Sequence, residues 1–172
     1  MGTPDRDRFD LLAPRDLAIT LHSLHRRFGS IRTRAMSPRL ADVVGRLGPS
    51  GRRLDDQLAE AARGAALTRN ALDTALNSID PVIPNAVLDV SERVFTDERV
   101  WTVETAIASI DDDATAAAER VEHASADELS RSVRVTGSGM TTPLVVAQQM
   151  ARELIGALTS AEHHVDWLET QV

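Results

Sequence analysis

The sequence predicts an all-α fold, a four-helix bundle of the up-and-down type with one long crossover. Two observations carry this prediction: four long segments repeat apolar residues every three or four positions, and breaks containing proline or glycine separate them. The alternation of apolar and polar residues that marks a strand extends only over residues 132–136. We expect helices at about 15–35, 51–79, 97–124 and 141–171, within one domain over 14–172 that follows an N-terminal arm of residues 1–13.

The first predicted helix begins at Pro14, which suits a first turn because its missing N–H costs nothing there. Its apolar side chains recur at alternating intervals of four and three residues, as in helices that cross at a shallow angle: Leu17, Leu21, Leu24, Phe28 and Ile31. A short helix over residues 39–48 is expected to follow, ended by Gly48 and Pro49.

The second predicted helix carries an apolar stripe from Leu54 to Ile79. It is expected to end at Asp80, because the residue before a proline is disfavoured in a helix. Residues 81–85 then form the clearest linker, and residues 86–93 are expected to be a short helix or an extended crossover.

Thr96 is expected to cap the third helix, with Val100, Val103, Ile107 and Ile110 facing inward. We interpret the three acids at 111–113 as favourable charges at a helix start rather than as metal ligands. Ser125 and Glu128 have the spacing of a capping box, which predicts one more short helical turn.

The last helix has the longest uninterrupted pattern in the chain. Thr141 or Thr142 is positioned to cap it, and Pro143 suits its first turn. One apolar face runs along it, formed by Met150, Leu154, Leu158, Ala161, Val165, Leu168 and Val172.

Composition excludes several kinds of chemistry. The chain has no cysteine, which rules out disulfides and thiolate sites, and all 19 basic residues are arginine, which rules out lysine nucleophiles. The charged start and the lack of an apolar run approaching roughly 18 residues predict a cytoplasmic protein with no membrane partner.

Charge is unevenly distributed along the chain. The net charge is −7, but residues 1–53 carry about +6 and the remainder about −13. The net acidity argues against nucleic acid as a partner, and the asymmetry predicts that the basic part packs beside acidic later helices or a partner subunit. A homodimer is therefore a further expectation.

Two histidines lie where they can reach a seam between helices. His164 flanks the apolar face of the last helix, whereas His163 points away from it, and His25 flanks the seam of the first helix. A metal site needs three or more converging side chains, and the spacing shows no such set. We therefore expect no metal and no cofactor, assign no catalytic residue, and leave open whether the chain is an enzyme.

The stretch from Ser125 to Ala157 resembles the last third of DinB-like and mycothiol-dependent maleylpyruvate isomerase-like helical bundles. In that superfamily a divalent metal is held by a histidine in a DVVxHL-like segment and by an RExxxH segment on the last helix. Asp42 to Leu47 (DVVGRL) and Arg152 to Ala157 (RELIGA) resemble these segments. Arg46 and Ala157 stand at the two histidine positions, and only Glu153 is retained.

The resemblance implies a bundle with a degenerate metal site and a role in binding a small molecule or a protein. The expected ligand-binding residues are Arg46, Glu153 and Ala157, together with His164 and His25. A metal-dependent thiol transferase or isomerase of the mycothiol type is the first alternative.

Two other resemblances lead to different functions. Residues 161–171 resemble the last-helix segment of bacterioferritins, which implies a ferritin-like iron-binding protein, but Ala161 stands where that family has a glutamate. Residues 39–61 are similar to a helix-turn-helix, in which Arg46, Arg52 and Arg53 would face DNA.

Overall fold

The computed structural model describes residues 9–96 and 98–172, and most of them are helical. Four long helices dominate, namely α2 (Pro14–Ala35), α3 (Leu54–Asn77), α4 (Val103–His123) and α6 (Pro143–Glu169). The all-α prediction is therefore confirmed in its main feature, although a small sheet accompanies the helices. No helix within the described residues is long and apolar enough to cross a membrane.

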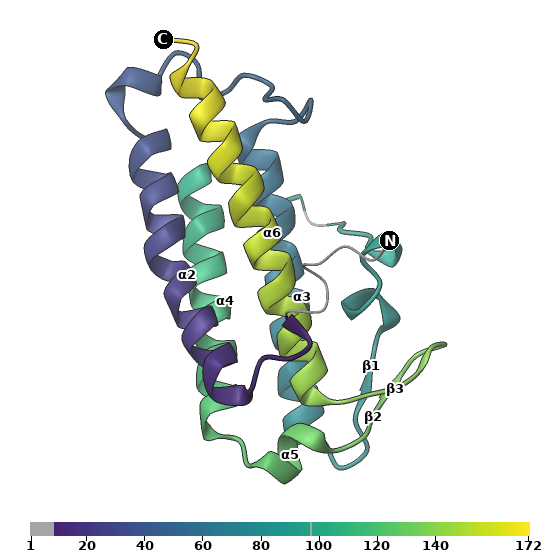
Figure 1. Ribbon diagram of the computed structural model, residues 1–172. Coiled ribbons are helices and arrows are strands. Elements are labelled where there is room, and N and C mark those ends of the chain that lie inside the picture. The colour runs from purple at the N-terminus through teal and green to yellow at the C-terminus, as the bar shows by residue number, and fades with distance from the viewer. Residues whose placement is uncertain (1–8, 97) are drawn as a thin grey trace, which may run out of the picture.

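Each of α2 and α3 packs against both α4 and α6. In Figure 1, α2 and α6 run upward while α3 and α4 run downward. Because the consecutive helices α3 and α4 are parallel, the chain must return between them, and residues 78–96 and 98–102 run along the outside of the helices (Figure 1). This returning segment contains the short 3₁₀ helices η2 (Asn85–Val87) and η3 (Val90–Glu92) and forms one wall of the candidate site.

Apolar periodicity explains how the helices pack. All five seam positions predicted on α2 are buried, and a fully buried leucine or phenylalanine contributes about 1.5–3 kcal/mol to stability. About half of the buried residues of α3 and α4 are alanines, whose small side chains let neighbouring helices approach closely. Phe9 and Leu12 of the N-terminal arm also pack against this core, whereas residues 1–8 lie outside the described part of the chain.

A three-stranded sheet forms beside the lower ends of α3 and α6 (Figure 1). Strand β1 (Val82–Ile83) pairs in parallel with β2 (Val133–Val135), and β2 pairs antiparallel with β3 (Gly139–Thr141). The alternating stretch at residues 132–136 coincides with β2, whereas no alternating pattern marked β1 or β3. Gly137 and Gly139, with φ of 75° and 96°, make the tight turn between β2 and β3.

The predicted short helix over residues 39–48 is wrong. Only η1 (Pro38–Leu40), a 3₁₀ helix, forms there, and turns follow it. The helix that a helix-turn-helix needs before its turn is therefore missing. Arg52 and Arg53 form ion pairs with Glu60 and Asp55, respectively.

The ends of the second and third predicted helices also differ from expectation. α3 ends at Asn77, so Ile79 is exposed. α4 begins at Val103, because Thr102 rather than Thr96 forms a reciprocal cap with Thr105. Val100, expected to face inward, is exposed, and the expected start at residue 97 lies outside the described residues.

Two smaller predictions had opposite outcomes. The capping box at Ser125 is confirmed, since its hydroxyl accepts from the backbone N–H of Glu128 at the start of α5 (Ala126–Ser130). The interpretation of residues 111–113 is wrong, because they lie inside α4 rather than at its start.

In α6, Thr142 is the cap. The predicted apolar face is buried except for Val172, which lies beyond the end of the helix.

Candidate functional site

A cleft of about 250 Å³ lies between α3, α6 and the returning segment. Its apolar surface comes mainly from small and aliphatic side chains, and its polar surface from two ion pairs and an amide. Glu153 and Ala157, both predicted as ligand-binding residues, line this cleft together with Gln57, Glu60, Ala61, Val90, Arg93, Leu154 and Ser160. Two of the five residues expected to bind a ligand therefore lie on the same wall of one cleft.

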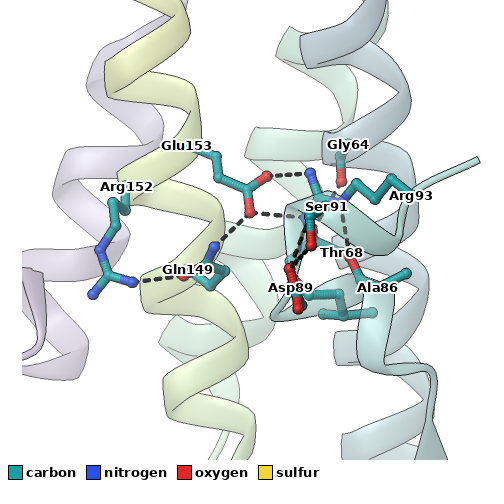
Figure 2. A network of polar contacts seen from close by, with 10 residues as sticks. Gly64, Thr68, Ala86, Asp89, Ser91, Arg93, Gln149, Arg152 and Glu153 are labelled. Carbon is teal, nitrogen blue, oxygen red and sulfur yellow. Dashed lines mark hydrogen bonds and ion pairs between the residues drawn. The ribbon is translucent and has the colours of Figure 1, made fainter.

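Arg93 binds Glu153 through two parallel hydrogen bonds (Figure 2). Its Nη1 donates to Oε2 at 2.6 Å and its Nη2 to Oε1 at 2.8 Å. The Arg93 side chain is only 7% exposed and that of Glu153 20% exposed. Charge-assisted bidentate pairs of this kind are strong and fix the orientation of both groups.

The backbone of the returning segment holds the Arg93 guanidinium in place. Its Nε donates to the carbonyl of Ala86 at 2.7 Å, and Nη2 also donates to the carbonyl of Val87 at 3.1 Å. These bonds and the two to Glu153 use most of the N–H groups of the guanidinium. Arg93 therefore fastens the returning segment to α6 and retains little capacity for a ligand.

Gly64 of α3 provides the space that Arg93 occupies. A Cβ at this position would lie 2.8 Å from Nη1 of Arg93 and 3.4 Å from Oε2 of Glu153. Glycine costs about 1 kcal/mol inside a helix, so its presence here has a packing reason.

Further polar side chains extend the pair along α6 (Figure 2). Gln149 donates from Nε2 to Oε1 of Glu153 at 2.6 Å, and Arg152 donates from Nη1 to Oε1 of Gln149 at 2.6 Å. Arg152 also pairs with Asp10 of the N-terminal arm. The Glu153 carboxylate therefore also has a hydrogen-bond partner on its own helix, α6.

Arg46, which was expected to bind a ligand together with Glu153, does not line the cleft. Arg46 lies in the turns that replace the expected helix over 39–48, and its side chain is exposed away from the cleft. Arg93 is the cation beside Glu153 instead. Residue spacing gave no signal for it, because 60 residues separate the partners.

A wider groove of about 570 Å³ continues the cleft outward and shares Arg52, Glu60, Val90 and Arg93 with it. Nη1 of Arg52 lies 2.7 Å from Oε2 of Glu60, so this pair balances its own charge. Arg63 lies over the Phe95 ring, with its guanidinium carbon 5.8 Å from the ring centroid, at the outer end of the groove.

His164 and His25 lie in different places and do not line the cleft. His164 is buried behind Gln57, a cleft residue whose Nε2 lies 3.0 Å from Nδ1 of His164. His25 is exposed in the groove between α2 and α4, with its Nδ1 3.0 Å from Oδ2 of Asp111. Burial raises the pKa of the Asp111 carboxyl, an effect that the contact with His25 opposes.

The metal implied by the DinB-like resemblance does not fit these residues. Both carboxylate oxygens of Glu153 already bind a guanidinium, and Ala157 offers no donor atom. Across residues 9–96 and 98–172, no three histidine, aspartate or glutamate side chains converge as metal ligands would.

No family model matches the chain, and no characterised protein or solved structure is significantly similar to it.

Proposed function

We propose that the chain is a DinB-like four-helix bundle that binds a small molecule in the α3–α6 cleft without a metal. The observation that supports this is the placement of Glu153 and Ala157 on one cleft wall, opposite the Arg93 guanidinium. In DinB-like bundles a metal ion would lie beside this glutamate, and here the Arg93 guanidinium lies there instead.

The charges of the cleft indicate what kind of ligand it binds. Arg93 is neutralised by Glu153 and Arg52 by Glu60, so the lining carries no excess charge. Alanine, valine and leucine side chains supply the apolar contacts. A small, mostly apolar molecule without net charge suits such a lining better than the carboxylate that an unpaired arginine would favour.

A cleft-filling substitution tests this function. Ala157→Phe places a ring in the cleft, whereas Thr159→Phe places the same ring on the exposed face of α6 two residues away. In a ligand-observed NMR screen of neutral fragments, we expect hits that bind the wild type and the Thr159 variant but not the Ala157 variant. The proposal fails if no fragment binds, or if Ala157→Phe, shown by circular dichroism to be folded, binds the same fragments.

A further inference from the structure

His164 is an enclosed histidine, only 2% exposed, in the second half of α6. Gly48 covers its ring so closely that a Cβ there would lie 2.6 Å from Nδ1. The Trp167 ring meets it edge-on, with centroids 6.0 Å apart and planes 75° apart. The imidazole therefore has no room to turn without moving its neighbours.

Nδ1 of His164 faces the side-chain amide of Gln57. With the amide nitrogen turned toward it, Nδ1 accepts the hydrogen bond, and the neutral ring then carries its proton on Nε2. This Nε2 is buried and has no hydrogen-bond partner among the described residues. The polar groups beside the ring are thus the Gln57 amide at Nδ1 and the backbone carbonyl of Arg46.

Gln57 connects His164 to the cleft. Its Nε2 also donates to Oγ of Ser50 at 2.9 Å, and its Oε1 accepts from Oγ of Ser160 at 3.1 Å. Both Gln57 and Ser160 line the cleft. Gln57 is therefore in contact with His164 on one side and with the cleft residue Ser160 on the other.

We propose that His164 is a proton-sensitive positioning residue whose protonation reverses the Gln57 amide and so changes the polar wall of the cleft. A proton taken from water onto Nδ1 would face the amide NH₂, and two donors cannot pair. Reversal of the amide brings Oε1 to the new Nδ1–H. The hydroxyls of Ser50 and Ser160 can follow, because each can donate or accept.

The surroundings favour the neutral ring at neutral pH. Burial lowers the pKa of His164, while the Arg46 carbonyl and, more weakly, the charge of Asp55 at the start of α3 oppose this. Asp55 is itself paired with Arg53. On the α2 side, the charges facing α6 are already in ion pairs: Arg27 with Glu162, and Arg34 with Asp166 and Glu169.

Acidification should lower the stability of the protein, because the folded state lowers the pKa of His164. Because the folded-state pKa lies below the ordinary value of 6.5, the unfolded chain binds the proton more readily. Above about pH 6.5 the ring is neutral in both the folded and the unfolded chain, and the full stability is present. As the pH falls below 6.5, the unfolded chain binds the proton first, and the free energy of unfolding decreases. The amide reverses over the same acidic range.

Two measurements on the protein alone test the proposal. Nitrogen-15 NMR of the histidines at about pH 7.5 should show His164 with its proton on Nε2. In a Trp101→Phe background, which leaves Trp167 as the single tryptophan, acidification should quench emission with a midpoint below pH 6.5, since imidazolium quenches a neighbouring indole. The amide NMR signals of Gln57 should shift with the same midpoint.

The control variants are His164→Gln, in which the quenching should be lost, and His163→Gln, which alters an exposed neighbour and should keep it. A proton on Nδ1 at neutral pH, an unshifted midpoint, or a Gln57 amide that does not respond would each overturn the proposal. The role in shaping the cleft rests on the proposed function. No ligand enters these measurements, so failure of a fragment screen leaves this test intact.

Discussion

Arg93 and Glu153, 60 residues apart in sequence, bind each other through two hydrogen bonds and join the returning segment to α6. The space for this contact comes from Gly64 of a third element, α3. Arg93 also draws the carbonyls of Ala86 and Val87 toward α3 and α6. The pair therefore shapes the cleft.

Removing one partner of this pair should be costly. Arg93→Leu or Glu153→Leu leaves a largely buried charge unpaired, and we expect each to lower the free energy of unfolding by about 3 kcal/mol. The double variant should cost clearly less than the sum, because it buries no lone charge. Urea denaturation measures all three.

The exposed ion pair between Arg134 and Asp80 provides the control. Arg134→Ala should change stability by less than about 1 kcal/mol. Additive losses in the Arg93 and Glu153 variants would mean that the two side chains do not interact in solution.

Gly64→Ala should destabilise the protein although alanine is the better helix former. The added Cβ meets a guanidinium that cannot withdraw without breaking its hydrogen bonds, and we expect a net loss of about 1–2 kcal/mol. In an Arg93→Leu background the loss should become smaller. Gly29→Ala, in α2 with nothing within 4 Å of the new Cβ, should instead stabilise by up to about 1 kcal/mol. Equal effects at both glycines would contradict this account.

Long helices were predictable because periodic burial extends over many residues. The buried faces of α2 and α6 follow the sequence pattern closely, and His164 rather than His163 faces inward as the pattern indicated. Helix ends were less predictable. Thr96 and Thr102 are both suitable caps, and only the reciprocal bond to Thr105 distinguishes them.

The candidate site was half predictable. Glu153 and Ala157 followed from a local motif, but Arg93 and Gln57 belong to the site through tertiary contacts that no spacing reveals. Arg46 was misplaced because DVVGRL was read as a helix, whereas the chain makes turns there.

The basic N-terminal third was expected to pack beside acidic later helices. Arg27 and Arg34 do so, since both form ion pairs with acids of α6. A homodimer stays a prediction, to be tested by sedimentation at micromolar concentration.

Metal analysis addresses the alternative enzyme functions. We expect the untagged protein to purify without a stoichiometric divalent ion, because Arg93 occupies both oxygens of Glu153. Added zinc or manganese should raise the melting temperature of wild type no more than that of Glu153→Gln. One bound ion per chain, lost on substitution of His25 or His164, would instead revive the metal-dependent functions, and paired iron the ferritin-like one.

Asp111→Asn should alter how stability depends on pH. Burial raises the folded-state pKa of Asp111 above the ordinary 3.8, so the folded chain binds this proton more readily than the unfolded chain. The stability tied to that proton is present at low pH and is lost as the pH rises through the folded-state pKa. As the pH rises from about 3 to 7, the free energy of unfolding of the wild type should therefore fall relative to that of the Asn variant. The difference should be no more than about 1 kcal/mol, because water still screens the carboxylate. Asp112→Asn removes a charge that adds weakly to the raised pKa of Asp111, so it should shift the stability in the same direction by a smaller amount.

Gly48→Ala tests how tightly the imidazole of His164 is enclosed. The new Cβ would lie 2.6–2.7 Å from three ring atoms, and Gln57 and Trp167 block the ring from moving away. Because overpacking a filled core typically costs about 1–3 kcal/mol, we expect a loss of that size in urea denaturation. Gly45→Ala, whose Cβ has its nearest neighbour at 4.0 Å, should leave stability almost unchanged. In a His164→Ala background the cost of Gly48→Ala should largely disappear, and a loss that persists there would place its cause in the turn backbone rather than in the ring.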